Sequence, residues 1–236
     1  MTWSILVRDP ATGALGAAVA TKFFAVGAIC IHVEGGVAAL ATQALINPMY
    51  AVHGMPRLRG GEPPSHVAAA LLAADDGRAQ RQLHILDAKG RMAQHTGDAC
   101  VTWAGHLAGH DVSVAGNMLA GPDVVAHTLQ AWTASTGTMA ERLLTALEVG
   151  EAAGGDKRGK QSAALKICTA DPYPDLDIRT DDHPDPLAEL RRLLAVSRER
   201  FATFRTFLAG RDSPSGIHDR SVIDAAIAKA DAARAE

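Results

Sequence analysis

The chain has 236 residues, enough for a large domain with a substantial core, and its formal net charge of −3 gives no broad attraction for nucleic acid or an anionic membrane surface. Its three cysteines, Cys30, Cys100 and Cys168, are far apart and form no Cys-x-x-Cys pair, which excludes a zinc knuckle and is typical of buried thiols in a reducing cytosol. No apolar run approaches the length of about 18 residues that a membrane span needs, and charge interrupts the N-terminal segment early. We therefore expect a cytoplasmic protein with no nucleic-acid or membrane partner.

The first half of the chain has the pattern of short strands with one helix. Residues 4–7 and 14–20 are apolar runs, and the segment between them contains Pro10 and Gly13, which predicts a hairpin turn. A helix is expected over residues 65–74, with Ser65 as its N-cap candidate. The other strands expected here are residues 28–33, 37–44, 82–86, 91–94 and 112–115.

The second half is mainly helical. Apolar spacing after Pro122 predicts two helices before about residue 151, the second over residues 139–147, and a strand follows at residues 162–167. After a loop at 171–186, an amphipathic helix begins near Leu187, and the Ala-rich residues 222–233 form another. Strands first and helices later favour an α+β fold, with helices on the faces of antiparallel sheet.

Thr2 is the first candidate for chemistry. A small residue after Met1 usually permits removal of that methionine, which leaves a hydroxyl nucleophile and an α-amine with a pKa of about 7.7–8.0 on one residue. Activation would then need only methionine removal, although many chains begin Met-Thr with no chemical consequence. The predicted hairpin brings Thr21 and Lys22 close to Thr2, where they could support the nucleophile. A solvated lysine at a strand end is the alternative for Lys22.

Polar side chains also follow two apolar strands. Gln43 and Asn47 stand at the end of residues 37–44, where they either face a pocket or cap the turn before Pro48. Asn117 lies between Gly116 and Gly121, so its amide and nearby main-chain N–H groups could form an oxyanion hole. The alternative for Asn117 is a left-handed turn position.

A glycine-rich loop covers residues 154–162. It matches Gly-x-x-x-x-Gly-Lys, but Gln161 stands where a phosphate loop needs Ser or Thr, and the loop joins a predicted helix to a strand rather than the reverse. Nucleotide binding is therefore not expected. Asp156 and Arg158 would instead orient a polar substrate, with Arg158 suited to a carboxylate, unless the loop is merely exposed.

Metal binding is not expected either. His95 with Asp98, and His106 with His110, have ligand-like spacings, but the glycines around them indicate turns rather than one helix face. The acidic Asp182 stays open as a substrate-binding residue. We expect no metal and no cofactor.

Several short motifs together resemble a known family, over residues 2 to about 194. They are Thr2-Trp3-Ser4-Ile5 with Arg8-Asp9, Ala41-Thr42-Gln43 with Asn47-Pro48, Ala115-Gly116-Asn117 with Leu119-Ala120-Gly121, Gly154-Gly155-Asp156 with Arg158-Gly159 and Gln161-Ser162, and Asp182-His183-Pro184-Asp185-Pro186. The family is the domain of unknown function 1028, which is similar to the N-terminal-nucleophile (Ntn) hydrolases. The resemblance implies a four-layer αββα sandwich with Thr2 at the active-site position.

This chain departs from the better-known Ntn patterns. Proteasome-like members carry an aspartate on the second hairpin strand, whereas this strand has no acid between Gly16 and Ala20. Asparaginase-like members use a second threonine, to which Thr21 is loosely similar. Support of the nucleophile by Thr21 or Lys22 is therefore a hypothesis.

The leading hypothesis is an amidohydrolase that cleaves an amide or other C–N bond of a small metabolite, with Thr2 as nucleophile. The alternatives are a non-catalytic small-molecule-binding relative and a structural subunit. Residues 1–195 would form the Ntn-like domain and residues 196–236 a helical extension, packed on that domain or at an interface of a homo-oligomer. The expected catalytic residues are Thr2, Thr21, Lys22 and Asn117, and the expected substrate-binding residues are Gln43, Asn47, Asp156, Arg158, Gln161 and Asp182.

Overall fold

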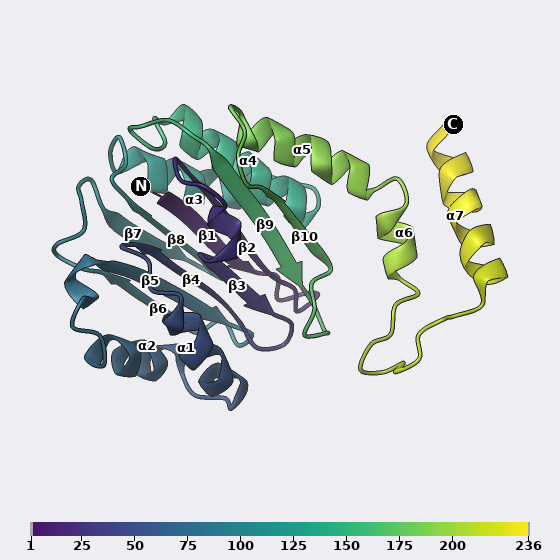
Figure 1. Cartoon of the computed structure of the whole chain (residues 1–236), viewed down its shortest axis with the longest axis horizontal. Coiled ribbons are helices and arrows are strands. Elements are labelled where there is room, and N and C mark those ends of the chain that lie inside the picture. Colours follow the sequence, from purple (N-terminus) through teal and green to yellow (C-terminus); the bar gives the residue numbers. More distant parts are fainter. Residues whose placement is uncertain (1, 236) are drawn as a thin grey trace. The chain divides into compact units, whose positions relative to one another are not determined.

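The computed structural model describes residues 2–235, and the chain divides after Leu190 into two compact units. The first unit contains two antiparallel sheets together with helices on their faces (Figure 1). The described residues include seven α-helices, so the expected α+β class is confirmed. Among them, none is both long and apolar enough to cross a membrane.

The larger sheet has six strands in the order β10-β9-β2-β1-β8-β7. The predicted hairpin is present as β1 and β2, and β1 also pairs with β8, so Thr2 lies opposite both Thr21 and Asn117. The first strand is thus the centre of the sheet, and both of its neighbours are buried. The strands are β1 (Thr2–Arg8), β2 (Leu15–Thr21), β7 (Gly105–Gly109), β8 (Val112–Asn117), β9 (Ser162–Cys168) and β10 (Leu176–Thr180).

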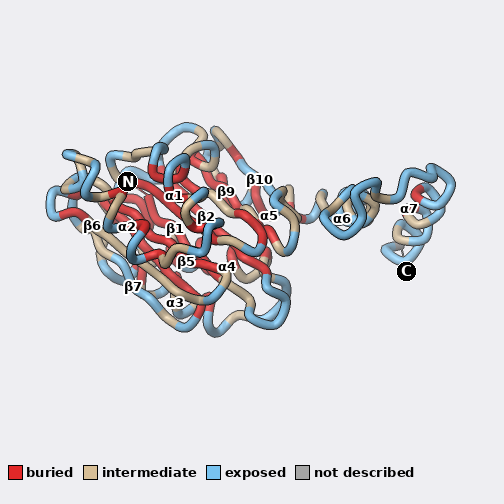
Figure 2. Tube along the Cα trace, turned by 90° about the horizontal axis from the view of Figure 1, so that it is seen from below, coloured by how far each residue is buried: buried red, intermediate tan, exposed pale blue. Residues whose placement is uncertain are grey.

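The smaller sheet has four strands in chain order and faces the larger one. Strands β4 and β5 contact β1 across the gap between the sheets, and the strands are buried there (Figure 2). Period-two alternation explains this arrangement, because each strand of the larger sheet turns one set of side chains toward the smaller sheet and the other set toward helices. The strands are β3 (Ile31–Glu34), β4 (Ala38–Ala44), β5 (Arg81–Asp87) and β6 (Met92–Thr96).

Two pairs of helices cover the outer faces (Figure 1). The helices α3 (Asp123–Ala134) and α4 (Met139–Ala152) contact the larger sheet, and α1 (Met49–Arg59) and α2 (Pro64–Ala73) contact the smaller one. A capping box between Thr138 and Glu141 begins α4. The expected N-cap Ser65 is wrong, because α2 begins at Pro64 after Pro63 and has no side-chain cap.

The second unit contains α6 (Phe201–Arg205) and α7 (Arg220–Ala235), which contact each other. The helix α5 (Pro186–Ser197) spans the boundary between the units. The expected helix at residues 222–233 is part of α7. The expected division after residue 195 stays a prediction.

Three elements were not expected from the sequence. The helix α1 contains Pro56 near its C-terminal end, where a proline removes one hydrogen bond but need not stop the preceding turns. The strand β7 begins and ends with glycine, and β10 lies within the expected loop; pairing with β8 and β9, respectively, gives these segments their strand conformation. In addition, a 3₁₀ turn over Val26–Ala28 delays the start of β3.

Candidate functional site

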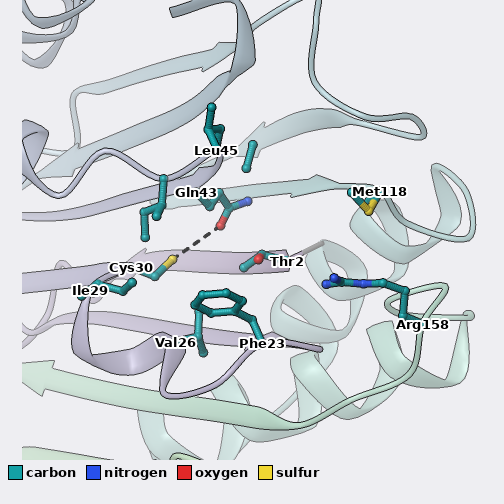
Figure 3. A pocket seen from close by; sticks show the side chains of 11 residues that line it. Thr2, Phe23, Val26, Ile29, Cys30, Gln43, Leu45, Met118 and Arg158 are labelled. Atoms are coloured by element: carbon teal, nitrogen blue, oxygen red, sulfur yellow. Dashed lines mark hydrogen bonds between the residues drawn. The ribbon is translucent and has the colours of Figure 1, made fainter. Parts of the chain in front are cut away.

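A pocket of about 330 Å³ opens where the central strand β1 begins (Figure 3). That volume suits a small metabolite rather than a folded partner. The lining is mostly apolar and includes a single charged side chain. The lining residues are Thr2, Phe23, Val26, Ile29, Cys30, Gln43, Ala44, Leu45, Ile46, Met118 and Arg158.

Thr2 brings a hydroxyl to this pocket. Its side chain is nearly buried, and its Oγ1 atom lies 3.1 Å from Oγ1 of Thr21 on the paired strand. Asn117 donates from Nδ2 to the main-chain oxygen of Thr2 over 3.4 Å and to Oε1 of Gln82 over 3.1 Å. Both amide hydrogens of Asn117 are therefore engaged, so this side chain holds Thr2 in place and has no hydrogen left for an oxyanion. Met1 lies outside the described residues.

Several residues at the same pocket have a positive φ, a backbone conformation that residues other than glycine rarely adopt. Four non-glycine residues within 2–235 have positive φ, and two of them, Ala44 at 69° and Met118 at 58°, line the pocket where β4 and β8 end. A third, Ala25, lies between the lining residues Phe23 and Val26. Such conformations are unfavourable for residues with a Cβ and cluster at binding and active sites.

The glycine-rich loop is attached to this site through Asp156. The buried carboxylate accepts the main-chain N–H groups of Lys22 and Arg158, each over 2.8 Å, and the N–H of Gln161 donates to the oxygen of Thr21. Asp156 also forms an isolated bridge with Leu119, close to the end of β8. A carboxylate that accepts main-chain N–H groups from two segments fixes both of them. Asp156 therefore holds the glycine-rich loop against the end of β2.

Arg158 extends from this loop into the pocket, on the side of Thr2 opposite Ile29 and Cys30 (Figure 3). Its guanidinium contacts Asp156 over 3.2 and 3.4 Å, and the side chain is 44% exposed. Lys22 instead directs its Nζ to the main-chain oxygen of Lys160, 3.4 Å away. Arg158 is therefore the cation that the pocket presents to a ligand.

Gln43 also lines the pocket, and hydrogen bonds to neighbouring residues fix its orientation. Gln82 donates to the main-chain oxygens of Gly105 and Gly116, so its Oε1 must accept, and Nε2 of Gln43 donates to it over 2.7 Å. Oε1 of Gln43 then accepts from the hydroxyl of Ser4 over 2.7 Å. The thiol of Cys30 also donates to Oε1 of Gln43, over 3.8 Å (Figure 3), and Nε2 donates to the main-chain oxygen of Ala115 as well as to Gln82, so the amide group is fully engaged.

A buried polar network continues from Gln43 between the two sheets. Because the Ser4 hydroxyl donates to Gln43, Nε2–H of His84 must donate to Ser4, over 2.8 Å, and Nδ1 of His84 must accept from Ser113, over 2.7 Å. Burial lowers the pKa of His84 to about 3, and the nearby His106 contributes, so the ring is neutral at physiological pH.

Sequence reasoning did not identify this network. A signal was present, since Gln82 and His84 occupy alternate positions on β5 and therefore share a face, as Thr2 and Ser4 do on β1. No single member of the network carried a recognisable motif.

Cys30 also lines the pocket. Burial raises the pKa of its thiol, which keeps the thiol protonated and makes it a poorer nucleophile than Thr2.

Four residues expected to bind substrate do not line this pocket: Asn47, Asp156, Gln161 and Asp182. Asn47 accepts from the N–H of Met49 at the start of α1 and donates to Asp75, so it performs the turn-capping role that was the alternative for it. Gln161 donates from Nε2 to Asp182, and neither residue is among those that line the pocket.

The histidines with ligand-like spacing also have other partners. His95 contacts the main-chain oxygen of Arg78, and His106 contacts the hydroxyl of Thr96. Within residues 2–235, no three His, Cys, Asp or Glu side chains come together as a possible metal site.

Comparison with known proteins establishes the family. A family model described as "Family of unknown function (DUF1028)" matches residues 2–190, so the chain belongs to that family. The crystal structure of protein SPO2555 from Silicibacter pomeroyi, of the same family, is similar over 92% of this chain and 99% of that one, with 31% identity and a TM-score of 0.86. Anbu, the ancestral beta-subunit from Yersinia bercovieri, aligns over 88% and 98% with 12% identity and a TM-score of 0.39. No curated protein matches the chain.

Proposed function

We propose that this protein is an N-terminal-nucleophile hydrolase that cleaves an amide or other C–N bond of a small metabolite, and that its two sheets and covering helices form a four-layer αββα sandwich of that type. The observation that carries the proposal is the placement of Thr2. Its hydroxyl faces a pocket at the beginning of the central strand, with the hydroxyl of Thr21 3.1 Å away.

The chemistry follows once Thr2 is the first residue. The α-amine accepts the hydroxyl proton as Oγ1 attacks the substrate carbonyl, and the same proton passes to the leaving nitrogen when the C–N bond breaks. Water then hydrolyses the ester on Thr2 and regenerates the hydroxyl. Thr21 orients the nucleophile, and Asn117 holds the Thr2 main chain from the other neighbouring strand.

The oxyanion would be bound by main-chain N–H groups at the pocket. Among residues 2–235, the main-chain N–H groups of the lining residues Phe23 and Ile46 have no hydrogen-bond partner, so they are the candidate donors. Lys22 would act through its charge near the site, because its ammonium group is directed to Lys160. Assembly into a homo-oligomer and a cytoplasmic location stay predictions.

One experiment tests the nucleophile. The intact mass of the untagged protein establishes whether Met1 is absent. The protein is then screened against a library of small amides beside Thr2→Ala, with Thr136→Ala, at an exposed threonine far from Thr2 in sequence, as the matched control. We expect loss of Met1, turnover by the wild type and the control, and no turnover by Thr2→Ala. Turnover by Thr2→Ala that equals the wild type would refute the mechanism.

A second function is favoured by one specific observation. No charged side chain within residues 2–235 hydrogen-bonds to Oγ1 of Thr2, and the pocket is mostly apolar, as in a protein that only binds a small molecule. Full retention of Met1 would favour this binding function, because the nitrogen of Thr2 would then be an amide and could not act as a base.

A further inference from the structure

The pocket at Thr2 has two chemically different ends. In Figure 3, Ile29 and Cys30 lie on one side of Thr2 and Arg158 lies on the other. Val26 and Ile46 add to the apolar lining. A substrate whose carbonyl carbon is held at Thr2 would therefore extend an apolar group in one direction and meet a cation in the other.

The charge of Arg158 is available to a ligand. Its partner Asp156 is already satisfied by two main-chain N–H groups at 2.8 Å, whereas the guanidinium contacts are longer, at 3.2 and 3.4 Å, and involve Nε and Nη2. Within the described chain, Nη1 of Arg158 has no hydrogen-bond partner. A guanidinium with open donors, held at a pocket wall by a buried carboxylate, is suited to bind a substrate carboxylate.

We infer that the substrate is an N-acylated amino acid with a compact apolar acyl group, and this inference rests on the proposed amide hydrolysis. The acyl group occupies the end of the pocket near Ile29 and Cys30, the amide carbonyl lies at Thr2, and the carboxylate on the leaving side binds Arg158. This order follows the order of the lining residues. It also makes the reaction chemically complete, since Thr2 retains the acyl group as an ester, the free amino acid departs with the transferred proton, and water releases the carboxylic acid.

The size of the pocket limits the acyl group. A volume of about 330 Å³ lies at the lower end of ligand pockets, so a branched aliphatic or single aromatic acyl group fits and a long fatty chain does not.

Binding is tested separately from turnover with Thr2→Ala protein. The probes are glycine carrying an acetyl, a 3-methylbutanoyl or a benzoyl group, each beside its neutral carboxamide, and dissociation constants are measured by titration calorimetry. We expect the 3-methylbutanoyl or benzoyl acid to bind at least about tenfold more tightly than its carboxamide, as one charge-assisted contact allows. In the Thr2→Ala protein, the additional substitution Arg158→Gln should reduce the preference for the acid over its carboxamide to below about twofold. Arg158→Lys should retain part of this preference.

Arg179→Gln is the matched control, because Arg179 lies on the half-exposed strand β10, pairs with Asp181 just after that strand and does not line the pocket. The Arg179→Gln variant should keep the full preference for the acid over its carboxamide. Equal affinity for acids and carboxamides, or no binding of any probe, would overturn the inference. A preference for the acids that Arg158→Gln leaves unchanged would also overturn it, because the carboxylate would then bind elsewhere.

The same probes, incubated with the wild-type protein whose N-terminus has been verified by mass, distinguish this inference from the proposed function. Glycine release measures turnover. Arg158-dependent binding without glycine release would support the carboxylate site and count against Thr2 as a nucleophile. Equal turnover of acids and carboxamides would support Thr2 and refute the carboxylate site.

Discussion

The neutral His84 between the two sheets should make the stability of the first unit depend on pH. Burial lowers the pKa of its ring to about 3 in the folded protein, against about 6.5 in the unfolded chain. The unfolded chain therefore binds more protons between pH 6.5 and 3, and the free energy of unfolding falls as the pH falls through that window. From these two pKa values, His84 alone removes about 2 kcal/mol of stability between pH 7 and pH 5.

The variant His84→Gln isolates this contribution. It keeps a neutral side chain with hydrogen-bonding groups in place of the ring, so it should be less stable than the wild type at pH 7 by about 1–3 kcal/mol, because one of the bonds to Ser4 and Ser113 is lost. Its stability should then fall less steeply toward pH 5, and the difference between the two proteins should narrow by about 2 kcal/mol.

The measurement is urea unfolding at pH 7, 6 and 5, followed by tryptophan fluorescence, since Trp3, Trp103 and Trp132 all lie in the first unit. His66→Gln, at an exposed position of α2, is the matched control and should keep the wild-type slope. Parallel stability curves for the wild type and His84→Gln between pH 7 and pH 5 would refute the reasoning, because they would mean that the ring does not remain neutral in the folded protein.

Three further predictions concern the residues around Thr2. Thr21→Val removes the hydroxyl 3.1 Å from Oγ1 of Thr2, so kcat on a verified amide substrate should fall by at least tenfold while the melting temperature changes little; an unchanged kcat would assign Thr21 to packing alone. Asp156→Asn replaces a buried carboxylate that accepts two main-chain N–H groups, so chemical denaturation should show a loss of about 1–3 kcal/mol, and a neutral effect would contradict its organising role. Ala44→Gly relieves a φ of 69°, so the same assay should show a gain of up to about 1 kcal/mol; destabilisation would mean that the methyl group matters more than the strain.

Local sequence signals were sufficient for much of the fold. The first hairpin, the strands β5 and β6, and the helices α2, α3 and α4 were predicted from apolar runs, apolar spacing and turn residues, because these elements are specified within one or two neighbouring segments. The elements that were missed depend on distant partners. The glycine-bounded β7 is a strand because β8 lies beside it, and β10 is one because β9 does.

The site divides in the same way. The sequence by itself determined that a threonine near the N-terminus would begin a hairpin and that Thr21 would lie opposite it, since antiparallel pairing follows from the hairpin. It also placed Asp156 and Arg158 in one loop, but it could not decide whether that loop was merely exposed.

Only the tertiary structure decided which polar residues meet. Asn47 and Gln43 looked equivalent at the end of one strand. Asn47, however, accepts from the N–H of Met49 in the turn before α1 and donates to Asp75, while Gln43 lines the pocket and joins the interior network. His84 carried no motif, and its role depends on Ser4 and Ser113 from two other strands. Hydrogen bonds between buried side chains are set by the packing of the two sheets, and that packing is a property of the whole domain rather than of any local segment.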